Sequence, residues 1–251
     1  MEKSVAEVIE IARASDDDSV STFRSLISCD GWPLPEWASR YTAWMNVRVD
    51  GISARDLYRI LLCAVAPRPI AWVSTVNPEG RPNLAPFSFF NVVSSEPPIL
   101  GFSPGVRTLP HGHEEKGTLV NIRATGEFVV NVVPYELAEA MNMTSGDYEY
   151  GVNEFEVARL ASRPSEMVTP MQVAGSPVSF ECRLERILDF GADGEGSSLV
   201  LGRIVCVHVE ESVMRDGKID GDALDLVGRM GGLQYSRTTE RFELKRPEVK
   251  R

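Results

Sequence analysis

Cysteine and histidine are scarce in this sequence, which has four of the first and three of the second in 251 residues. The cysteines are Cys29, Cys63, Cys182 and Cys206; they lie far apart and form no C-x-x-C pair. That spacing argues against a structural zinc site and against a disulfide framework. We therefore expect thiols, most of them buried, in a reducing compartment.

Long apolar runs and an excess of basic charge are also missing. The longest apolar run covers residues 60–66, far short of the ~20 residues that a membrane helix needs. The chain begins Met-Glu-Lys without an apolar segment behind it, so no signal peptide is expected. The formal charge of −10 disfavours binding to nucleic acid or to an anionic membrane. We expect a cytoplasmic protein with neither kind of partner.

The sequence motifs of several enzyme classes are absent as well. There is no G-x-S-x-G elbow, no H-E-x-x-H helix, no P-loop and no G-x-G-x-x-G after a strand. His111 and His113 are a local pair, but Pro110 and Gly112 beside them indicate an exposed loop, so no metal is expected. His208 lies within an apolar segment, where we expect a structural role.

Residues 1–50 predict a helical extension. Ser4 and Glu7 have the spacing of a capping box, and apolar residues follow at helical spacing. Further along, Trp37, Tyr41 and Trp44 fall on one helix face. This face would pack on the body of the protein or on a second subunit, or it would form a lid over a site.

Residues 51–251 predict a domain of different character. From about Leu57 the pattern is one of short strands with frequent turns, which favours an antiparallel barrel over a βαβ fold. Asn77-Pro78-Glu79-Gly80 is a strong turn signal between two of the strands. The expected strands are residues 70–76, 83–86, 87–93, 99–102, 127–133, 178–188 and 198–209, with helices at 118–124 and 135–143.

Polar side chains gather beside aromatic ones in residues 67–133. They comprise the hydroxyls of Ser74, Thr75, Ser88, Ser94 and Thr118, the amides of Asn83 and Asn121, and the cations Arg68 and Lys116. Hydroxyls, amides and a cation can satisfy the acceptor oxygens of a phosphate. A flat apolar wall can hold a ring system. The set therefore suits a ligand with a phosphate at one end and a flat ring at the other, although Ser and Thr are also ordinary strand residues.

The order of the motifs in this region is more specific than its composition. They are the PRPIAWVST run from Pro67, N-x-A-P-x-S-x-F from Asn83, S-x-x-P-P from Ser94, K-x-T-x-x-N-I from Lys116 and TGEFVVN from Thr125. With Gly228-Arg-Met-Gly-Gly232 and Tyr235 further on, the chain resembles the flavin reductase-like family of FMN-binding split-barrel proteins from about Asp56 to Pro247.

The resemblance implies a mostly β fold, an antiparallel Greek-key split barrel of the FMN-binding type with peripheral helices. It also implies a homodimer with FMN, or alternatively FAD, in a groove near the interface. The implied cofactor-binding residues are Arg68, Ser74, Thr75, Asn83, Ala85, Pro86, Ser88, Phe89, Phe90, Ser94, Lys116, Thr118 and Asn121.

The resemblance also suggests where these residues meet the flavin. Lys116, Thr118 and the hydroxyls would lie towards the phosphate, while Asn83, Ala85 and Pro86 would lie along the ring. Arg229 and Tyr235 are further candidates for closing the site; the alternative for Arg229 is a structural ion pair. The family usually has Lys-Asp-Thr where this chain has Lys116-Gly117-Thr118, so an acidic side chain is missing.

The function implied by the resemblance is an NAD(P)H:flavin reductase that supplies reduced flavin to a partner monooxygenase. Hydride passes from the nicotinamide to the flavin, so no side chain need act as acid or base. Arg68 and Arg229 would stabilise the anionic reduced flavin. One alternative is an FMN-dependent oxidoreductase for a small aromatic or nitro compound. Another is an FMN-binding electron carrier without turnover of its own.

Overall fold

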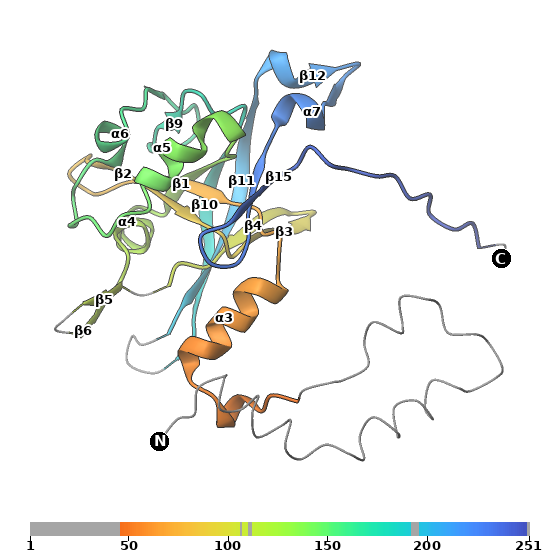
Figure 1. The fold of residues 1–251 in the computed structure, drawn as a ribbon. Coiled ribbons are helices and arrows are strands. Elements are labelled where there is room, and N and C mark those ends of the chain that lie inside the picture. The colour runs from red at the N-terminus through yellow and green to blue at the C-terminus, as the bar shows by residue number, and fades with distance from the viewer. Residues whose placement is uncertain (1–45, 106, 110–111, 192–195, 250–251) are drawn as a thin grey trace, which may run out of the picture. The chain divides into compact units, whose positions relative to one another are not determined.

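The structure is a computed structural model that describes residues 46–105, 107–109, 112–191 and 196–249 (Figure 1). The expected helices of the N-terminal extension lie outside the described residues. The chain divides into two units, Met1–Val65 and Ala66–Arg251, which are described separately. None of the described helices is long and apolar enough to cross a membrane.

The described part of the first unit holds a 3-10 turn, Val49–Gly51, and helix α3, Ala54–Ala64. Strands were expected from about Leu57, so the expectation was wrong here. The Ser53 side chain accepts a hydrogen bond from Asp56 N–H and caps the helix. Leu, Arg and Ala, which favour helices, fill the next turns. The strands begin only after the prolines of Pro67-Arg68-Pro69.

An antiparallel sheet of seven strands forms the second unit (Figure 1). Its strands follow the order β2-β1-β7-β10-β11-β4-β3. Their bounds are β1 Ala71–Val76, β2 Pro82–Phe87, β3 Phe90–Ser95, β4 Pro98–Phe102, β7 Glu127–Asn131, β10 Val178–Asp189 and β11 Ser198–Val209. The mostly β, antiparallel architecture expected from the sequence is confirmed.

Short hairpins and helices complete this unit. The paired short strands are β5 Arg107–Leu109 with β6 Gly112–Glu114, β8 Ser162–Arg163 with β9 Gln172–Val173, β12 Met214–Arg215 with β13 Lys218–Ile219, and β14 Val227–Arg229 with β15 Tyr235–Arg237. The helices are α4 Gly117–Thr125, α5 Ala138–Met143, α6 Glu154–Val157 and α7 Gly221–Leu224, with 3-10 turns at Tyr135–Leu137 and Glu211–Val213.

The turn between β1 and β2 is the one that the sequence predicts. Asn77 Oδ1 accepts a hydrogen bond from Arg81 N–H at 2.8 Å, and Asn77 N–H donates to the Arg81 carbonyl. Gly80 has a φ of +80°, a conformation that other residues adopt only with strain. The turn fixes the register of the hairpin, in which Thr75 pairs with Asn83.

Strand β1 is buried on both faces and separates two hydrophobic clusters. Ala71 and Val73 belong to the cluster that contains Phe102 and Phe128, whereas Trp72 belongs to the cluster on the other face. Trp72 is fully buried, and its Nε1–H donates to Thr144 Oγ1 at 2.9 Å. Neighbouring residues of β1 therefore point into different surroundings.

Gly202 on β11 lies directly against the ring of Phe128. A Cβ at position 202 would lie 2.2 Å from Phe128 Cζ and 3.2 Å from Cys182 Cβ. Both neighbours are fully buried and cannot swing into solvent. We expect Gly202→Ala to lower the free energy of unfolding by about 2–3 kcal/mol through overpacking, measured by urea denaturation. Gly105→Ala, which meets nothing within 4 Å, is the control; equal losses in both variants would contradict this packing argument.

The β2 edge of the sheet has no backbone N–H to offer another strand. Leu84 N–H points away from β1 and donates to Glu154 Oε2 at 2.9 Å. The backbone groups of residues two apart on a strand point to the same side, so those of positions 82 and 86 point to this edge as that of Leu84 does. Both positions are proline, which has no N–H. Burial raises the pKa of Glu154, while the bond from Leu84 opposes that rise. The two prolines and the buried carboxyl group of Glu154 therefore leave this edge without an N–H group for a further strand.

The β3 edge is different. Among the described residues of the second unit, β3 pairs only with β4. Its Val92 and Val93 are 62% and 56% exposed. A register shift lies between Val92 and Ser94. Val92 N–H donates to the exposed Asn91 side chain at 2.8 Å. An edge strand with two exposed valines is a surface on which another strand can add.

Candidate functional site

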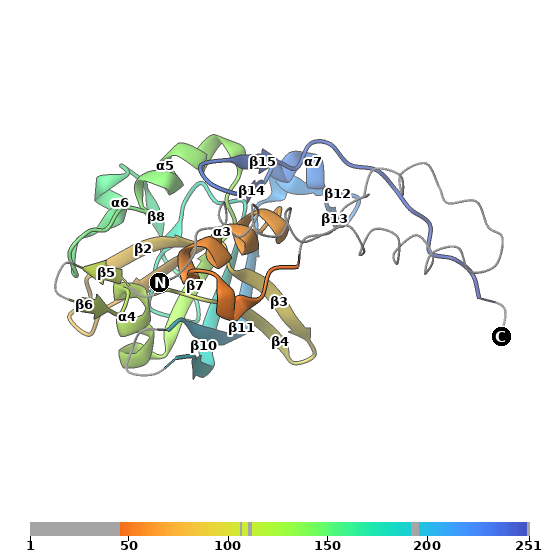
Figure 2. The same cartoon turned by 60° about the horizontal axis from the view of Figure 1, so that its bottom comes forward.

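Helix α4 lies against β1 and β2 and brings the first group of expected site residues together (Figure 2). Asn83 Nδ2 donates to Thr118 Oγ1 at 2.9 Å, and Asn121 Nδ2 donates to Thr75 Oγ1 at 3.0 Å. Tyr150, which the sequence analysis did not select, donates from its hydroxyl to Asn121 Oδ1 at 2.9 Å. We call these residues with Lys116 the α4 cluster.

Burial divides the α4 cluster into two kinds of residue. Thr75, Thr118 and Asn121 are almost fully buried, so within one chain they support their neighbours. Asn83 is half-buried and Tyr150 is exposed, and these two can meet a ligand. The sequence gives no motif for Tyr150, because only the fold brings its loop to α4.

Lys116 stands at the N-terminal end of α4. Its Nζ lies 2.9 Å from Asp147 Oδ1, and both side chains are partly or largely solvent-exposed. No side chain caps the helix here. The end of a helix where N–H groups are unsatisfied favours an anion. A lysine, a helix N-terminus and the amide of Asn83 therefore form an arrangement that suits a phosphate.

The acidic side chain that the resemblance leads one to expect at position 117 is replaced by a different carboxylate. A Cβ on Gly117 would lie 3.0 Å from Asn83 Oδ1 and 3.2 Å from Tyr150 Cδ2. Any larger side chain at 117 would displace these two groups. Asp147, from the loop that also carries Tyr150, supplies the carboxylate that pairs with Lys116.

Arg68 and Arg229 form the centre of a second group. Their backbones are hydrogen-bonded to each other in both directions, at 2.9 and 2.8 Å. Such a pair places the two side chains on the same face of the ladder. Arg68 Cζ lies 6.0 Å from the centre of the Phe89 ring, and Arg229 Cζ lies 4.5 Å from that of Tyr235. Two guanidinium groups thus lie next to two partly exposed rings.

The partners of the two arginines differ. Arg68 is 4% exposed; its Nη2 donates to the Met230 carbonyl at 3.0 Å and its Nε to Ser88 Oγ at 3.4 Å. Arg229 donates to the Gly232 carbonyl and is only half-buried. Among the described residues, no carboxylate lies within ion-pair distance of Arg229. An anion can therefore approach this guanidinium.

Five expected residues lie in neither group. Ser74 is fully buried on the opposite face of β1 from Thr75, and its hydroxyl donates to the Met171 carbonyl. Phe90 packs against the main core cluster. Ser94 lies on the open edge strand β3, opposite Ile99. Ala85 and Pro86 are half-buried on β2. Ala85 faces the core, and the backbone nitrogen of Pro86 cannot donate a hydrogen bond.

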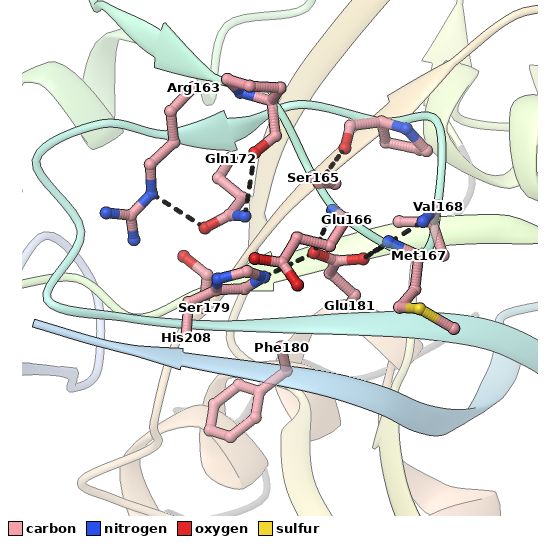
Figure 3. A network of polar contacts seen from close by, with 12 residues as sticks. Arg163, Ser165, Glu166, Met167, Val168, Gln172, Ser179, Phe180, Glu181 and His208 are labelled. Carbon is pink, nitrogen blue, oxygen red and sulfur yellow. Dashed lines mark hydrogen bonds and ion pairs between the residues drawn. The ribbon is translucent and has the colours of Figure 1, made fainter.

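A buried carboxylate that the sequence analysis did not select organises residues 164–171 (Figure 3). Glu181 is fully buried, and its oxygens accept hydrogen bonds from the backbone N–H groups of Glu166, Met167 and Val168 at 2.8, 2.6 and 3.1 Å. The ring of His208 lies 2.5 Å from Glu181 Oε1. His208 thus has the structural environment that its apolar strand predicted.

Glu181, Cys206 and His208 come close enough together to raise the question of a metal site. The carboxylate oxygens of Glu181 already accept four hydrogen bonds, three of them from backbone N–H groups of one turn. A cation there would face these N–H dipoles. Burial raises the pKa of the Cys206 thiol, and Glu181 raises it further. The arrangement therefore fits a structural anchor and does not fit a metal.

A cavity of about 310 Å³ lies on another side of α4, away from both groups of expected residues. Leu119, Arg123 and Phe190 are among its lining residues, and none of the expected cofactor-binding residues is. Arg123 is already paired with Glu115 and Asp189 at its rim. The charged side chains that line this cavity are therefore paired with one another.

Comparison with known proteins places the chain in a family. The model of the flavin reductase like domain matches residues 64–227. The uncharacterized protein BH2278 of Halalkalibacterium halodurans is 39% identical over 207 residues, which are 82% of this chain and 98% of that protein.

The similar solved structures include two that share more than 30% identity with this chain. Nitrilotriacetate monooxygenase component B from Bacillus cereus has a TM-score of 0.76 and 32% identity, over 80% of this chain and 99% of that one. The 2-nitrobenzoate 2-nitroreductase NbaA of Pseudomonas fluorescens has a TM-score of 0.71 and 31% identity, over 80% of this chain and 96% of that one. The chain therefore belongs to the flavin reductase-like family and has the split-barrel fold expected from its sequence.

Proposed function

We propose that this protein binds FMN and uses NAD(P)H to reduce it, and that it hands reduced flavin to a partner monooxygenase. The observation that carries the proposal is the α4 cluster. Lys116, the N-terminus of α4 and the Asn83 amide present positive charge and donors at one end of β1 and β2. That donor set fits the phosphate of FMN.

A bound flavin would supply the redox chemistry, as the acceptor of a hydride from the dihydronicotinamide. The chain's own residues would bind and orient. The Lys116 ammonium would exchange its Asp147 partner for the phosphate. The buried Thr118, Thr75 and Asn121 would hold the half-buried Asn83 and the exposed Tyr150 in place through their hydrogen bonds. Arg229, which has no carboxylate partner among the described residues, would stabilise negative charge at the ring.

The partners are part of the same proposal. The similar protein from Bacillus cereus is by name a component of a monooxygenase, which supports a partner monooxygenase for this chain. A second copy of the chain would complete the flavin groove, as in the homodimer that the resemblance implies. The described thiols, Cys63, Cys182 and Cys206, are free, which supports action in the reducing cytoplasm.

The name of NbaA favours a second candidate, reduction of a nitroaromatic acid. The Arg68 and Arg229 group supports it as well, because a guanidinium beside two aromatic rings suits an aromatic carboxylate. In this version the reduced flavin passes its electrons to a substrate bound in the same site.

An anaerobic visible spectrum of the protein with FMN tests the proposal. We expect the oxidised flavin band to bleach on addition of NADH or NADPH, faster than with free FMN, and to return when oxygen is admitted. Loss of 2-nitrobenzoate from the anaerobic reduced mixture would favour the second candidate. A protein-bound flavin that neither nucleotide reduces would overturn both and leave an electron carrier.

A further inference from the structure

The C-terminal segment of the described chain, residues 239–249, leaves the body of the second unit as an extended arm (Figure 1 and Figure 2). The last backbone anchor is Thr238, whose N–H donates to the Leu226 carbonyl at 3.0 Å. The Arg241 side chain pairs with Asp222. Beyond Arg241, residues 242–249 are all exposed, and no hydrogen bond or ion pair joins them to other described residues.

The arm carries large apolar side chains with nothing to cover them. Phe242 and Leu244 are each 84% exposed. They are two residues apart, so on an extended chain they point to the same side, with Glu243 and Lys245 on the other. An alternating pattern of this kind is typical of a strand that is buried on one face. The arm therefore has the sequence of a strand but pairs with no strand in the described part of its own chain.

Charge indicates what kind of surface the arm fits. Its residues from 241 onward include five cations, Arg241, Lys245, Arg246, Lys250 and Arg251, against two acids, Glu243 and Glu248. The whole chain carries −10, so the chain without residues 241–251 carries −13. A cationic arm on an acidic body is complementary to another copy of the same body. Eleven extended residues span about 36 Å, enough to reach across a small domain.

The two edges of the sheet differ in whether they can accept the arm as an added strand. The β2 edge offers no backbone N–H, because Pro82 and Pro86 lack one and Glu154 takes that of Leu84. The β3 edge has no proline and carries the exposed Val92 and Val93, and its Val92 N–H donates to the exposed Asn91 side chain rather than to a buried group. We propose that residues 241–245 of each arm add as a strand to the β3 edge of a second copy, with Phe242 and Leu244 covering its valines.

This inference rests on the homodimer that is part of the proposed function. The docking of the arm can nevertheless be wrong while the proposed flavin reduction is right. The test places a photo-crosslinking amino acid at Leu244 in the full-length chain and mixes ¹⁴N-labelled and ¹⁵N-labelled protein. We expect crosslinks from position 244 to residues 90–95, half of them joining the two labels at equal mixing. Crosslinks confined to one label, or directed to another surface, would overturn the proposal. Flavin reduction, measured by the anaerobic spectrum, does not depend on the outcome.

The double variant Phe242→Ala/Leu244→Ala gives an independent measure. We expect its dimer dissociation constant, from sedimentation equilibrium, to rise at least tenfold over that of the natural chain. Glu243→Gln/Lys245→Gln changes the opposite side of the same segment and keeps the arm's net charge, so we expect less than a twofold change. An unchanged dissociation constant in the apolar variant would also overturn the proposal. The altered side chains are exposed in the single chain, so the fold itself should survive.

Discussion

Replacing Glu181 with glutamine should lower the free energy of unfolding by about 3 kcal/mol at pH 7. The carboxylate is fully buried and accepts the N–H groups of three successive residues together with the His208 ring. A glutamine side chain would turn an NH2 group towards these donors and leave at least one buried N–H without an acceptor. For a domain of this size, we expect the midpoint of thermal unfolding to fall by roughly 6–12 °C.

Glu185→Gln is the matched control for this substitution. Glu185 lies on the same strand, β10, but it is exposed and pairs with Arg203 at 3.0 Å on the surface. An exposed ion pair contributes about 0–1 kcal/mol, so the control should unfold close to the natural chain. Urea denaturation of the three proteins measures the difference. A loss in Glu181→Gln no larger than that in the control would show that residues 164–171 do not depend on Glu181.

The structure also predicts how the difference in stability between the natural chain and Glu181→Gln changes with pH. Burial raises the pKa of Glu181, but the N–H groups of Glu166 and Met167 and the His208 ring outweigh burial and hold the pKa below its usual value. A carboxyl group with a lowered pKa stabilises the fold above its unfolded pKa and loses that contribution as the pH falls through the folded one. The stability gap between the natural chain and Glu181→Gln should therefore shrink below about pH 4.

Lys116→Met should weaken FMN binding by about 10–100-fold while leaving riboflavin binding within twofold. If Lys116 meets the phosphate, its removal costs one charge-assisted contact, about 1.5–3 kcal/mol. Riboflavin has the same ring without the phosphate, so it does not report on this contact. Titration of the quenching of flavin fluorescence measures both affinities. Because Lys116 is partly exposed and pairs only at the surface with Asp147, the substitution should leave the fold intact.

Lys218→Met controls for the loss of one positive charge elsewhere. Lys218 is exposed on the short strand β13, outside both groups of site residues. We expect it to change neither affinity, apart from a small effect at low salt. Equal weakening of FMN and riboflavin in Lys116→Met would contradict the assignment of Lys116 to the phosphate and move that contact to Arg68 or Arg229. The affinities for FMN and for riboflavin distinguish these two outcomes, so no activity assay is needed.

Local sequence patterns predicted most of the strands because their signals are short in range. The turn at residues 77–80 needs only Asn77 and Gly80, and the long hairpin strands β10 and β11 show their own alternation. Helix α3 was missed because its capping signal, Ser53 with Asp56, spans only four residues, and the apolar run that follows is as compatible with a strand as with a helix. A short apolar run does not distinguish helix from strand.

The sequence by itself determined the family, the antiparallel sheet and the set of polar residues to examine, since motif order and alternation are properties of the chain alone. Only the tertiary structure decided what those residues do. Adjacent residues of a strand face opposite sides, so Ser74 anchors the Met171 carbonyl while Thr75 joins α4. Tyr150, Asp147 and Glu181 acquire their roles from contacts over 29, 31 and 27 positions. Such contacts form only when the whole chain packs, because no local pattern specifies which distant segment will lie opposite.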